Sequence, residues 1–332
     1  MKRRDAFGTL VVLALGGLVG TRALRAQGTA APRRIAMLSG FGAADTKAFL
    51  DLMQPELERV GWAPGRDVVL LLPRTAEGRY ERLSGLAAEV LAERPDVILV
   101  QSAPATRAAM EASRSIPIVM VGTGDPVAYG LVADLRRPGG NVTGSSYLAD
   151  ESMVKTMQIL KEAVPRIGSV AVPYNPGNEA AVKLVKELPA TASPLGIKVQ
   201  TLAVKAPADF DEMFRLIARE RTESVLLAPE PLLRTHRAAL ADAALKQGLP
   251  LAIVGDPAYL PPNGLLSFGP TRLQYARITA RYVDAILRGA NPAGLPVEQP
   301  AKFDLAISLR TAKALGLAIP QTLLVRADEV IQ

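Results

Sequence analysis

Short apolar runs alternate with amphipathic segments along most of this chain, and this alternation constrains the fold more than any other feature of the sequence. From Arg34 the apolar runs lack a two-residue alternation, which indicates strands buried on both faces, as in parallel sheets. Helical periodicity between the runs predicts a doubly wound α/β domain. The predicted strands of this first series are 34–40, 67–73, 96–102 and 116–122.

The same pattern starts again after a predicted helix at 151–164. Ile35 and Val68, in the first and second strands of the first series, are 33 residues apart, and Val170 and Val199 of the second series are 29 apart. Sequence identity between the halves is weak, so the repeat is one of architecture. The predicted strands of the second series are 169–175, 197–204, 224–230 and 250–256.

The remaining elements do not simply extend the second half. A strand at 264–270, a helix at 272–287 and a strand and helix within 302–316 indicate a chain that crosses between the domains more than once, as in a hinge. We expect residues 33–145 and about 257–285 in the first domain, and residues 146–256 and about 286–332 in the second. A cleft between such domains places the carboxyl ends of strands around a ligand.

Residues 1–26 have the layout of a secretory signal peptide: a basic start, an apolar stretch from Phe7 to Val19 and small residues near Ala26. The apolar stretch is short for a membrane span. Arg3 and Arg4 are compatible with a twin-arginine signal and also with the general secretory route, so the export route stays open. We expect a protein exported to the periplasm.

The basic charge of the chain comes largely from this segment. It carries five basic residues and one acidic residue, so the formal net charge of +7 falls to about +3 without it. Runs of basic residues with interleaved aromatic residues are absent, as is the spacing of a helix-turn-helix or zinc finger, which argues against a nucleic-acid partner. The mature chain of about 306 residues favours two domains.

The chain has no cysteine, which excludes disulfides, thiolate metal sites, thiol nucleophiles and a lipid anchor on a cysteine of this chain. The fingerprints of dinucleotide-binding sites, P-loops and serine nucleophile elbows are also missing. His236, the one histidine, lies in 232–248, which has the pattern of a solvated helix. We therefore expect no catalytic residue, no cofactor and no metal, although a carboxylate pair could act without histidine.

Four stretches in order resemble the substrate-binding proteins of ABC transporters, a group that includes tryptophan- and phenylalanine-binding lipoproteins. The stretches cover most of the chain from Arg34 to Ile331. The resemblance implies two type I periplasmic-binding-protein domains that close on a small ligand, such as an amino acid or related carboxylate. It also implies delivery of the ligand to a membrane permease with its ATPase, and we expect a monomer. The stretches are "ELERVGWAPGRDVVL", "ERPDVILVQSAPATRAAMEASRSIPIVMVG", "GDPVAYGLVADLRRPGGNVTG" and "PVEQPAKFDLAISLRTAKALGLAIPQTLLVRADEVI".

An amino-acid ligand needs donors for its carboxylate, oxygens for its ammonium and an apolar wall. In the first half, Ser102 precedes a predicted helix and suits the carboxylate, either as a ligand contact or as a helix cap. Ala103 stands where family members often have a hydroxyl residue. Thr123 and Asp125 follow the fourth strand, where Asp125 could hold the ammonium or brace its own loop. Phe41, after the first strand, is a candidate for the apolar wall.

The second half offers matching candidates at its strand ends. Asn175 and Asn178 follow its first strand, and Tyr174 is a second candidate for the wall, although loop aromatic residues also serve in packing. Glu230 and Asp256 follow later strands, and we expect at least one of them to face the cleft, with helix capping as the alternative. Trp62 lies away from this end and is expected to pack in the core.

Several functions fit this fold. The first is a periplasmic binding protein of an ABC importer, the second a sensor module that presents ligand to a membrane receptor, and the third an α/β enzyme. The effector domain of a cytosolic regulator fits least, because the chain has a signal peptide and no DNA-reading module. Aromatic residues make up only 5% of the chain, which disfavours a bulky aromatic ligand.

Overall fold

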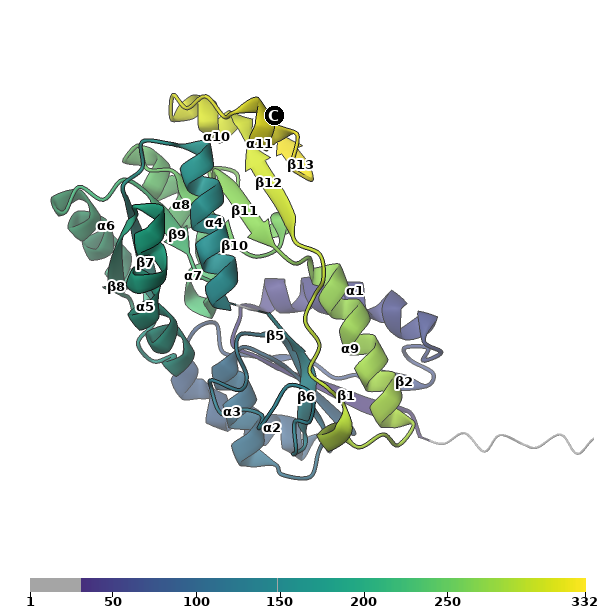
Figure 1. Cartoon of the computed structure of the whole chain (residues 1–332). Helices are drawn as coiled ribbons and strands as arrows, with labels where there is room; N and C mark the ends of the chain where they lie inside the picture. The colour runs from purple at the N-terminus through teal and green to yellow at the C-terminus, as the bar shows by residue number, and fades with distance from the viewer. Residues whose placement is uncertain (1–30, 148) are drawn as a thin grey trace, which may run out of the picture. The chain divides into compact units, whose positions relative to one another are not determined.

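The computed structural model describes residues 31–147 and 149–332, and the predicted signal peptide at 1–26 lies outside the described residues. Residues 32–332 form one compact unit that contains two α/β lobes, each built on its own sheet (Figure 1). All strand pairings in the two sheets are parallel except one antiparallel pairing in the second sheet, so the predicted fold class is confirmed.

The sheet of the first lobe has the strand order β2-β1-β4-β5-β6, with β3 also paired to β1. All of these pairings are parallel. The strands are β1 (Arg33–Ser39), β2 (Val68–Leu70), β3 (Arg74–Thr75), β4 (Val97–Gln101), β5 (Ile118–Thr123) and β6 (Val142–Ser146).

The sheet of the second lobe has the order β13-β12-β11-β10-β9-β7-β8. Its strands β8, β7, β9, β10 and β11 follow the same spatial order as the first sheet, so the repeat of architecture is visible in the topology. The strands are β7 (Ser169–Tyr174), β8 (Lys198–Ala203), β9 (Val225–Leu227), β10 (Leu251–Val254), β11 (Leu266–Gly269), β12 (Asp304–Ser308) and β13 (Glu329–Ile331).

Helices cover both faces of each sheet, which explains the apolar runs. In β1, Ile35 and Met37 pack under α1 and α9, whereas Ala36 and Leu38 belong to the core under α2 and α3. Alternate residues of a strand point to opposite faces, so a strand covered on both sides needs apolar residues throughout. The helices are α1 (Ala43–Arg59), α2 (Leu83–Ala92), α3 (Ala103–Ala112), α4 (Ala149–Ala163), α5 (Glu179–Ala192), α6 (Phe210–Arg219), α7 (Pro231–Thr235), α8 (Arg237–Lys246), α9 (Arg272–Leu287), α10 (Leu309–Ala314) and α11 (Gln321–Leu324).

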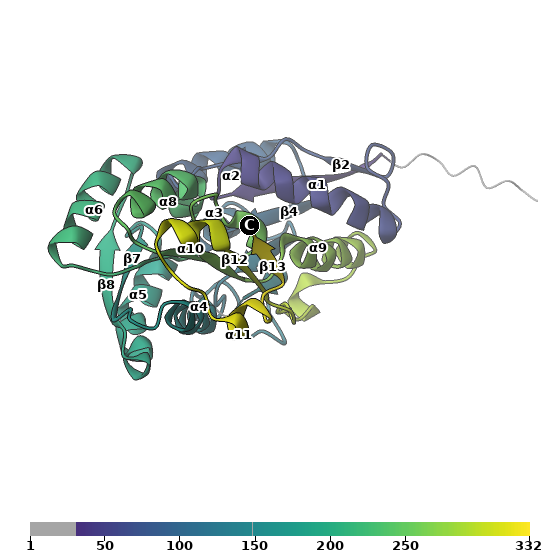
Figure 2. The ribbon, with the colours of Figure 1, turned by 90° about the horizontal axis from the view of Figure 1, so that it is seen from above.

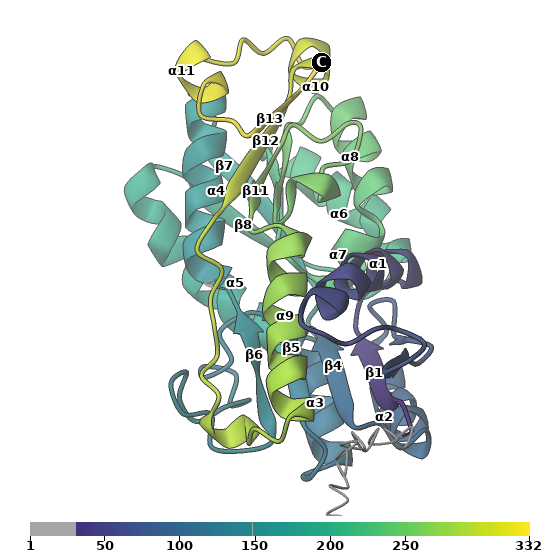
Figure 3. The ribbon, with the colours of Figure 1, turned by 90° about the vertical axis from the view of Figure 1, so that its right-hand side faces the viewer.

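The chain passes between the lobes repeatedly, and these crossings differ in detail from the expected boundaries. β11 pairs with β10 in the second sheet, whereas the expected boundary places residues 257–285 in the first domain. Only α9 then returns to pack beside α1 and β5 (Figure 3). The chain finally runs back along α9 to β12, which pairs antiparallel with β11 beside β13 and α10 (Figure 2).

The segment after β5 contains a strand that is not among the four predicted for the first series. β6 completes the first sheet here by pairing parallel with β5. Its sequence, Val-Thr-Gly-Ser-Ser, has little apolar character. Thr143 and Ser145 can nevertheless lie inside the sheet, because their hydroxyl groups donate hydrogen bonds to backbone carbonyls. Small polar residues that satisfy their hydrogen bonds can lie inside a sheet without an apolar pattern.

None of the helices in residues 31–147 and 149–332 combines the length and the hydropathy needed to cross a membrane.

Gly144 is the glycine of this segment on which the first sheet depends. Its φ is +124°, and a Cβ atom there would lie 2.4 Å from the carbonyl oxygen of Met120 in the neighbouring strand. We expect Gly144→Ala to lower the free energy of unfolding by about 2–4 kcal/mol, from strain and overpacking together. Denaturant unfolding measures this loss.

Gly140→Ala is the matched control, because Gly140 has open space around the added Cβ and an ordinary backbone conformation. It should stay within about 1 kcal/mol of the wild type. Equal stability losses in the two variants would contradict the structure of β6.

Candidate functional site

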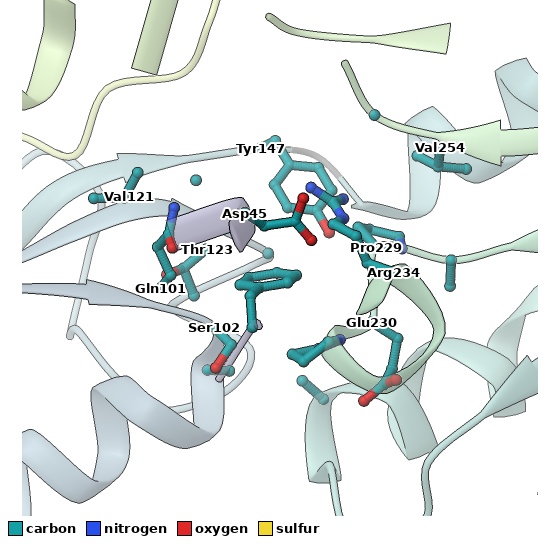
Figure 4. Close-up of a pocket in the computed structure, with 18 of the residues that line it drawn as sticks. Asp45, Gln101, Ser102, Val121, Thr123, Tyr147, Pro229, Glu230, Arg234 and Val254 are labelled. Carbon is teal, nitrogen blue, oxygen red and sulfur yellow. The ribbon is translucent and has the colours of Figure 1, made fainter. Parts of the chain in front are cut away.

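A cavity of about 100 Å³ lies at the carboxyl ends of strands from both sheets (Figure 4). It is bordered by the segments that follow β1, β4 and β5 in the first lobe and β9 and β10 in the second. Because both sheets have the same strand order, their carboxyl ends form equivalent loops that meet at this place. Small-molecule sites lie preferentially between domains and at such strand ends.

Most of the site residues expected from the sequence line this cavity. They are Phe41, Ser102, Ala103, Thr123, Asn178, Glu230 and Asp256.

Three expected residues do not line the cavity. The Asp125 carboxylate accepts hydrogen bonds from the backbone N–H groups of Val127 and Ala128, both at 3.0 Å, and so braces its own loop. Tyr174 packs against the core of the second lobe. Asn175 is buried, accepts a hydrogen bond from Gly177 N at 2.9 Å and donates one to Gly78 O at 3.4 Å across the lobes.

Ser102 combines the two roles that the sequence left open. Its Oγ caps α3 by accepting a hydrogen bond from Ala105 N at 3.4 Å, while the residue also borders the cavity. Its backbone has φ +89° and ψ 151°, a region that non-glycine residues rarely adopt. Nearby, Thr123 is 1% exposed and its Oγ1 has no hydrogen-bond partner among the described residues. Strain and an unsatisfied hydroxyl at one cavity are typical of a binding site.

The two acids of the second lobe are occupied as caps. Glu230 is 1% exposed and its carboxylate accepts hydrogen bonds from Leu233 N at 3.1 Å and from the Tyr80 hydroxyl of the first lobe. Burial raises the pKa of Glu230 to about 7, although Tyr80 and the helix N–H groups oppose the shift. Asp256 accepts hydrogen bonds from Ala258 N at 2.8 Å and Arg272 N at 2.5 Å, and pairs with the Arg272 side chain.

Arg234 is the most informative residue of the cavity, and the sequence analysis misses it. Its guanidinium lies 3.9 Å from the ring centre of Tyr259 and 5.0 Å from that of Phe41, which belongs to the other lobe. Burial lowers the pKa of Arg234, but Tyr259, Tyr147 and Asp45 raise it by more, so the side chain stays charged. Arg234 forms none of the ion pairs found among the described residues.

The other charges around the cavity are matched. Asp45 is 8% exposed and pairs with Arg237 at 3.1 Å, a contact that joins the lobes. Figure 4 shows the Asp45 carboxylate and the Arg234 side chain directed toward one another beside Tyr147, with Gln101 and Thr123 on the side of the first lobe. Asp256 pairs with Arg272, which leaves Arg234 as the cation of the cavity without a bound anion in the described residues. Asp45 lies inside the first turn of α1, whose N-cap is Gly42.

Aromatic side chains also gather here to a degree that composition does not reveal. Among the described residues, six of the chain's fifteen aromatic residues line the cavity. Burial raises the pKa of Tyr275 well above its usual value, so this ring is a neutral wall. The six are Phe41, Phe49, Tyr129, Tyr147, Tyr259 and Tyr275.

Two other residues that the sequence analysis discussed lie away from the cavity. Trp62 packs against the core of the first lobe, and its indole N–H donates to Asp284 at 2.9 Å. His236 is half-buried and its ring meets that of Phe210 edge to face. In the part of the chain that the structure describes, no cluster of His, Asp and Glu residues has the arrangement of a metal site. The chemistry of the cavity is therefore that of recognition: a half-buried cation, oxygen acceptors, hydroxyl groups and aromatic faces.

Comparison with known proteins gives several similar structures. A conserved domain protein from Vibrio cholerae O1 biovar El Tor strain N16961 is 28% identical, with a TM-score of 0.84 over 90% of this chain and 100% of that one. The ABC domain in complex with L-Trp from Streptococcus pneumonia is 22% identical, with a TM-score of 0.82 over 91% of this chain and 100% of that one.

Among curated proteins, the tyrosine-binding protein of Clostridioides difficile strain R20291 is 34% identical over 120 residues, 36% of this chain. The match spans 34% of the length of that relative. The model of the ABC transporter substrate binding protein family matches residues 61–331, which include most of the cavity. The chain therefore belongs to the ABC transporter substrate binding protein family.

Proposed function

We propose that this protein binds a small molecule, an amino acid or related carboxylate, in the cavity between its lobes and presents it to the permease and ATPase of an ABC importer. The predicted signal peptide and the family support export to the periplasm, where such a protein would work as a monomer. In this role the ligand is released unchanged, so no catalytic residue is needed.

The observation that carries this proposal is the charge of Arg234, which is half-buried and forms no ion pair among the described residues. A half-buried guanidinium loses part of its hydration, and two aromatic faces replace only part of what is lost. The planar guanidinium matches a carboxylate with two parallel hydrogen bonds. A ligand carboxylate at Arg234 would therefore replace the hydrogen bonds to water that the guanidinium loses on folding.

An amino acid also brings an ammonium group, and Asp45 is the acceptor that the cavity offers. An ionised carboxylate has about four acceptor positions. Asp45 uses one of them for Arg237 and lines the cavity beside Arg234. Carboxylate and ammonium of one ligand could thus meet opposite charges from the two lobes.

The aromatic walls and the relatives support an apolar or aromatic side chain. The Streptococcus structure holds L-Trp, and the Clostridioides relative is a tyrosine-binding protein. Six aromatic side chains around the cavity of this chain can contact such a ligand, so its low total aromatic content is no argument against one.

Contacts between the lobes support closure around the ligand. Tyr80 donates to Glu230, Asp45 pairs with Arg237, and Asn175 donates to Gly78 O, each contact joining one lobe to the other. Opening of these contacts would let a ligand enter between the lobes. Hinge motion about the crossings between the lobes would provide this opening.

We expect Arg234→Met to weaken binding of L-tyrosine and L-tryptophan by about 100-fold or more, since it removes the partner of the ligand carboxylate. Isothermal titration calorimetry of the mature chain measures the change. Arg234→Lys keeps the charge but not the planar guanidinium, so its affinity should lie between those of the wild type and Arg234→Met.

Arg215→Met is the control, because Arg215 is 74% exposed on α6. It should bind as the wild type does. If Arg234→Met binds either amino acid with wild-type affinity, the proposed role of Arg234 is wrong.

The pKa of Glu230 predicts a pH dependence of stability. The folded chain holds a proton on Glu230 up to about pH 7, while the unfolded chain loses it near pH 4.5. Stability should therefore fall as the pH rises through this window. The free energy of unfolding should fall by up to about 3 kcal/mol across this window, and this fall should be absent in Glu230→Gln.

Denaturant unfolding of both proteins between pH 4.5 and 8 measures this difference. Parallel stability curves for the wild type and Glu230→Gln would show that burial does not shift the pKa of Glu230.

A further inference from the structure

A second chamber of about 400 Å³ lies next to the ligand cavity, on the side of α3 and α5. It is also formed by both lobes, and it is larger than the cavity of about 100 Å³ that contains Arg234. We call the two spaces the inner cavity and the outer chamber. The residues that line both are Ala103, Tyr129, Asn178 and Ala180.

These four residues line both spaces and therefore form the wall between them. Two of them are alanines, so the bulk of the wall comes from Tyr129 and Asn178. Asn178 is fixed as the N-cap of α5, where its Oδ1 accepts from Ala180 N at 3.2 Å. Tyr129 is the large group that separates the spaces.

Tyr129 is held in place from several sides. Its backbone N–H donates to Asp125 O at 3.1 Å, within the loop that the Asp125 carboxylate braces. Its carbonyl oxygen accepts from the Arg107 guanidinium at 2.7 Å. Its ring lies so close to Gly124 that a Cβ there would be 2.9 Å from the ring edge. A ring fixed in this way works as a rigid partition.

The outer chamber differs in chemistry from the inner cavity. It carries Arg107 and Lys183 together with Glu111 and Glu179, so its charges balance, and Arg107 lies 3.7 Å from Glu179 across the lobes. The carboxylates of Glu111 and Glu179 offer acceptors for a terminal ammonium that follows a peptide group.

We propose that the outer chamber is a second compartment of the ligand site and that Tyr129 determines specificity by limiting ligand length. With Tyr129 in place, a single amino acid fills the inner cavity. Without it, the site takes an amino acid extended on its nitrogen, that is, a dipeptide whose carboxylate remains at Arg234 and whose first residue enters the outer chamber. The inference rests on the proposed function, because it uses the same inner cavity.

The test compares L-tyrosine and L-tryptophan with glycyl-L-tyrosine and glycyl-L-tryptophan by isothermal titration calorimetry. The wild type should prefer the amino acids over the dipeptides, and Tyr129→Ala should reduce this preference by about tenfold or more. Tyr129→Leu should reduce it less and provides a second measurement if the alanine variant does not fold.

Two further variants separate the partition from a general effect of removing bulk. Tyr147 lines the inner cavity alone, so Tyr147→Ala should not improve dipeptide binding. Ala108 lines the outer chamber alone, so adding Ala108→Trp to Tyr129→Ala should restore the preference for single amino acids.

The outcomes distinguish the two proposals. If the wild type binds neither amino acid, the proposed function fails and this inference fails with it. If the wild type binds them but Tyr129→Ala and Tyr129→Leu keep its preference, the partition is wrong and the proposed function stands. Equal binding of amino acids and dipeptides by the wild type would also overturn the role of Tyr129.

Discussion

The charge of the half-buried Arg234 side chain is the constraint on which the site depends. Its guanidinium contacts the ring of Tyr259 in its own lobe and the ring of Phe41 in the other lobe. The contact between the lobes therefore places a positive charge without an ion-pair partner at the cavity. Arg237 and Arg272 already pair with Asp45 and Asp256. This leaves one cation for an incoming anion. A site of this kind binds a small carboxylate strongly because the desolvation of the cation is already part of folding.

The repeated topology explains why these groups meet. Both sheets place their first five strands in the same order, so each presents its carboxyl ends, and the helix N-termini after them, toward the same cavity. The crossings after β11 and before β12 connect the lobes at the side of the cavity and allow α9 to complete the first lobe. Tyr275 of α9 contributes its ring to the cavity, so even the crossing elements take part in recognition.

Much of the fold could be predicted because buried parallel strands leave a direct mark in the sequence, and β1, β4, β5 and β10 lie where the apolar runs indicate. β6 was not predicted because its inward residues are small and polar. The site was harder to predict. Phe41, Ser102 and Glu230 follow strands, which topology identifies, but Arg234 lies in a segment whose charges and alanines suggested a solvated helix. Only tertiary packing reveals that its guanidinium lies at the cavity beside two aromatic rings. The aromatic wall is likewise assembled from distant segments, so the overall aromatic content does not reveal it.

A crystal structure of the mature chain grown with L-tyrosine or L-tryptophan tests this account most directly. The account predicts ligand density in the inner cavity, with the ligand carboxylate within hydrogen-bonding distance of the Arg234 guanidinium and with contacts from both lobes. A ligand bound elsewhere, or one in the cavity whose carboxylate is held by other groups while Arg234 stays away from it, would contradict the account.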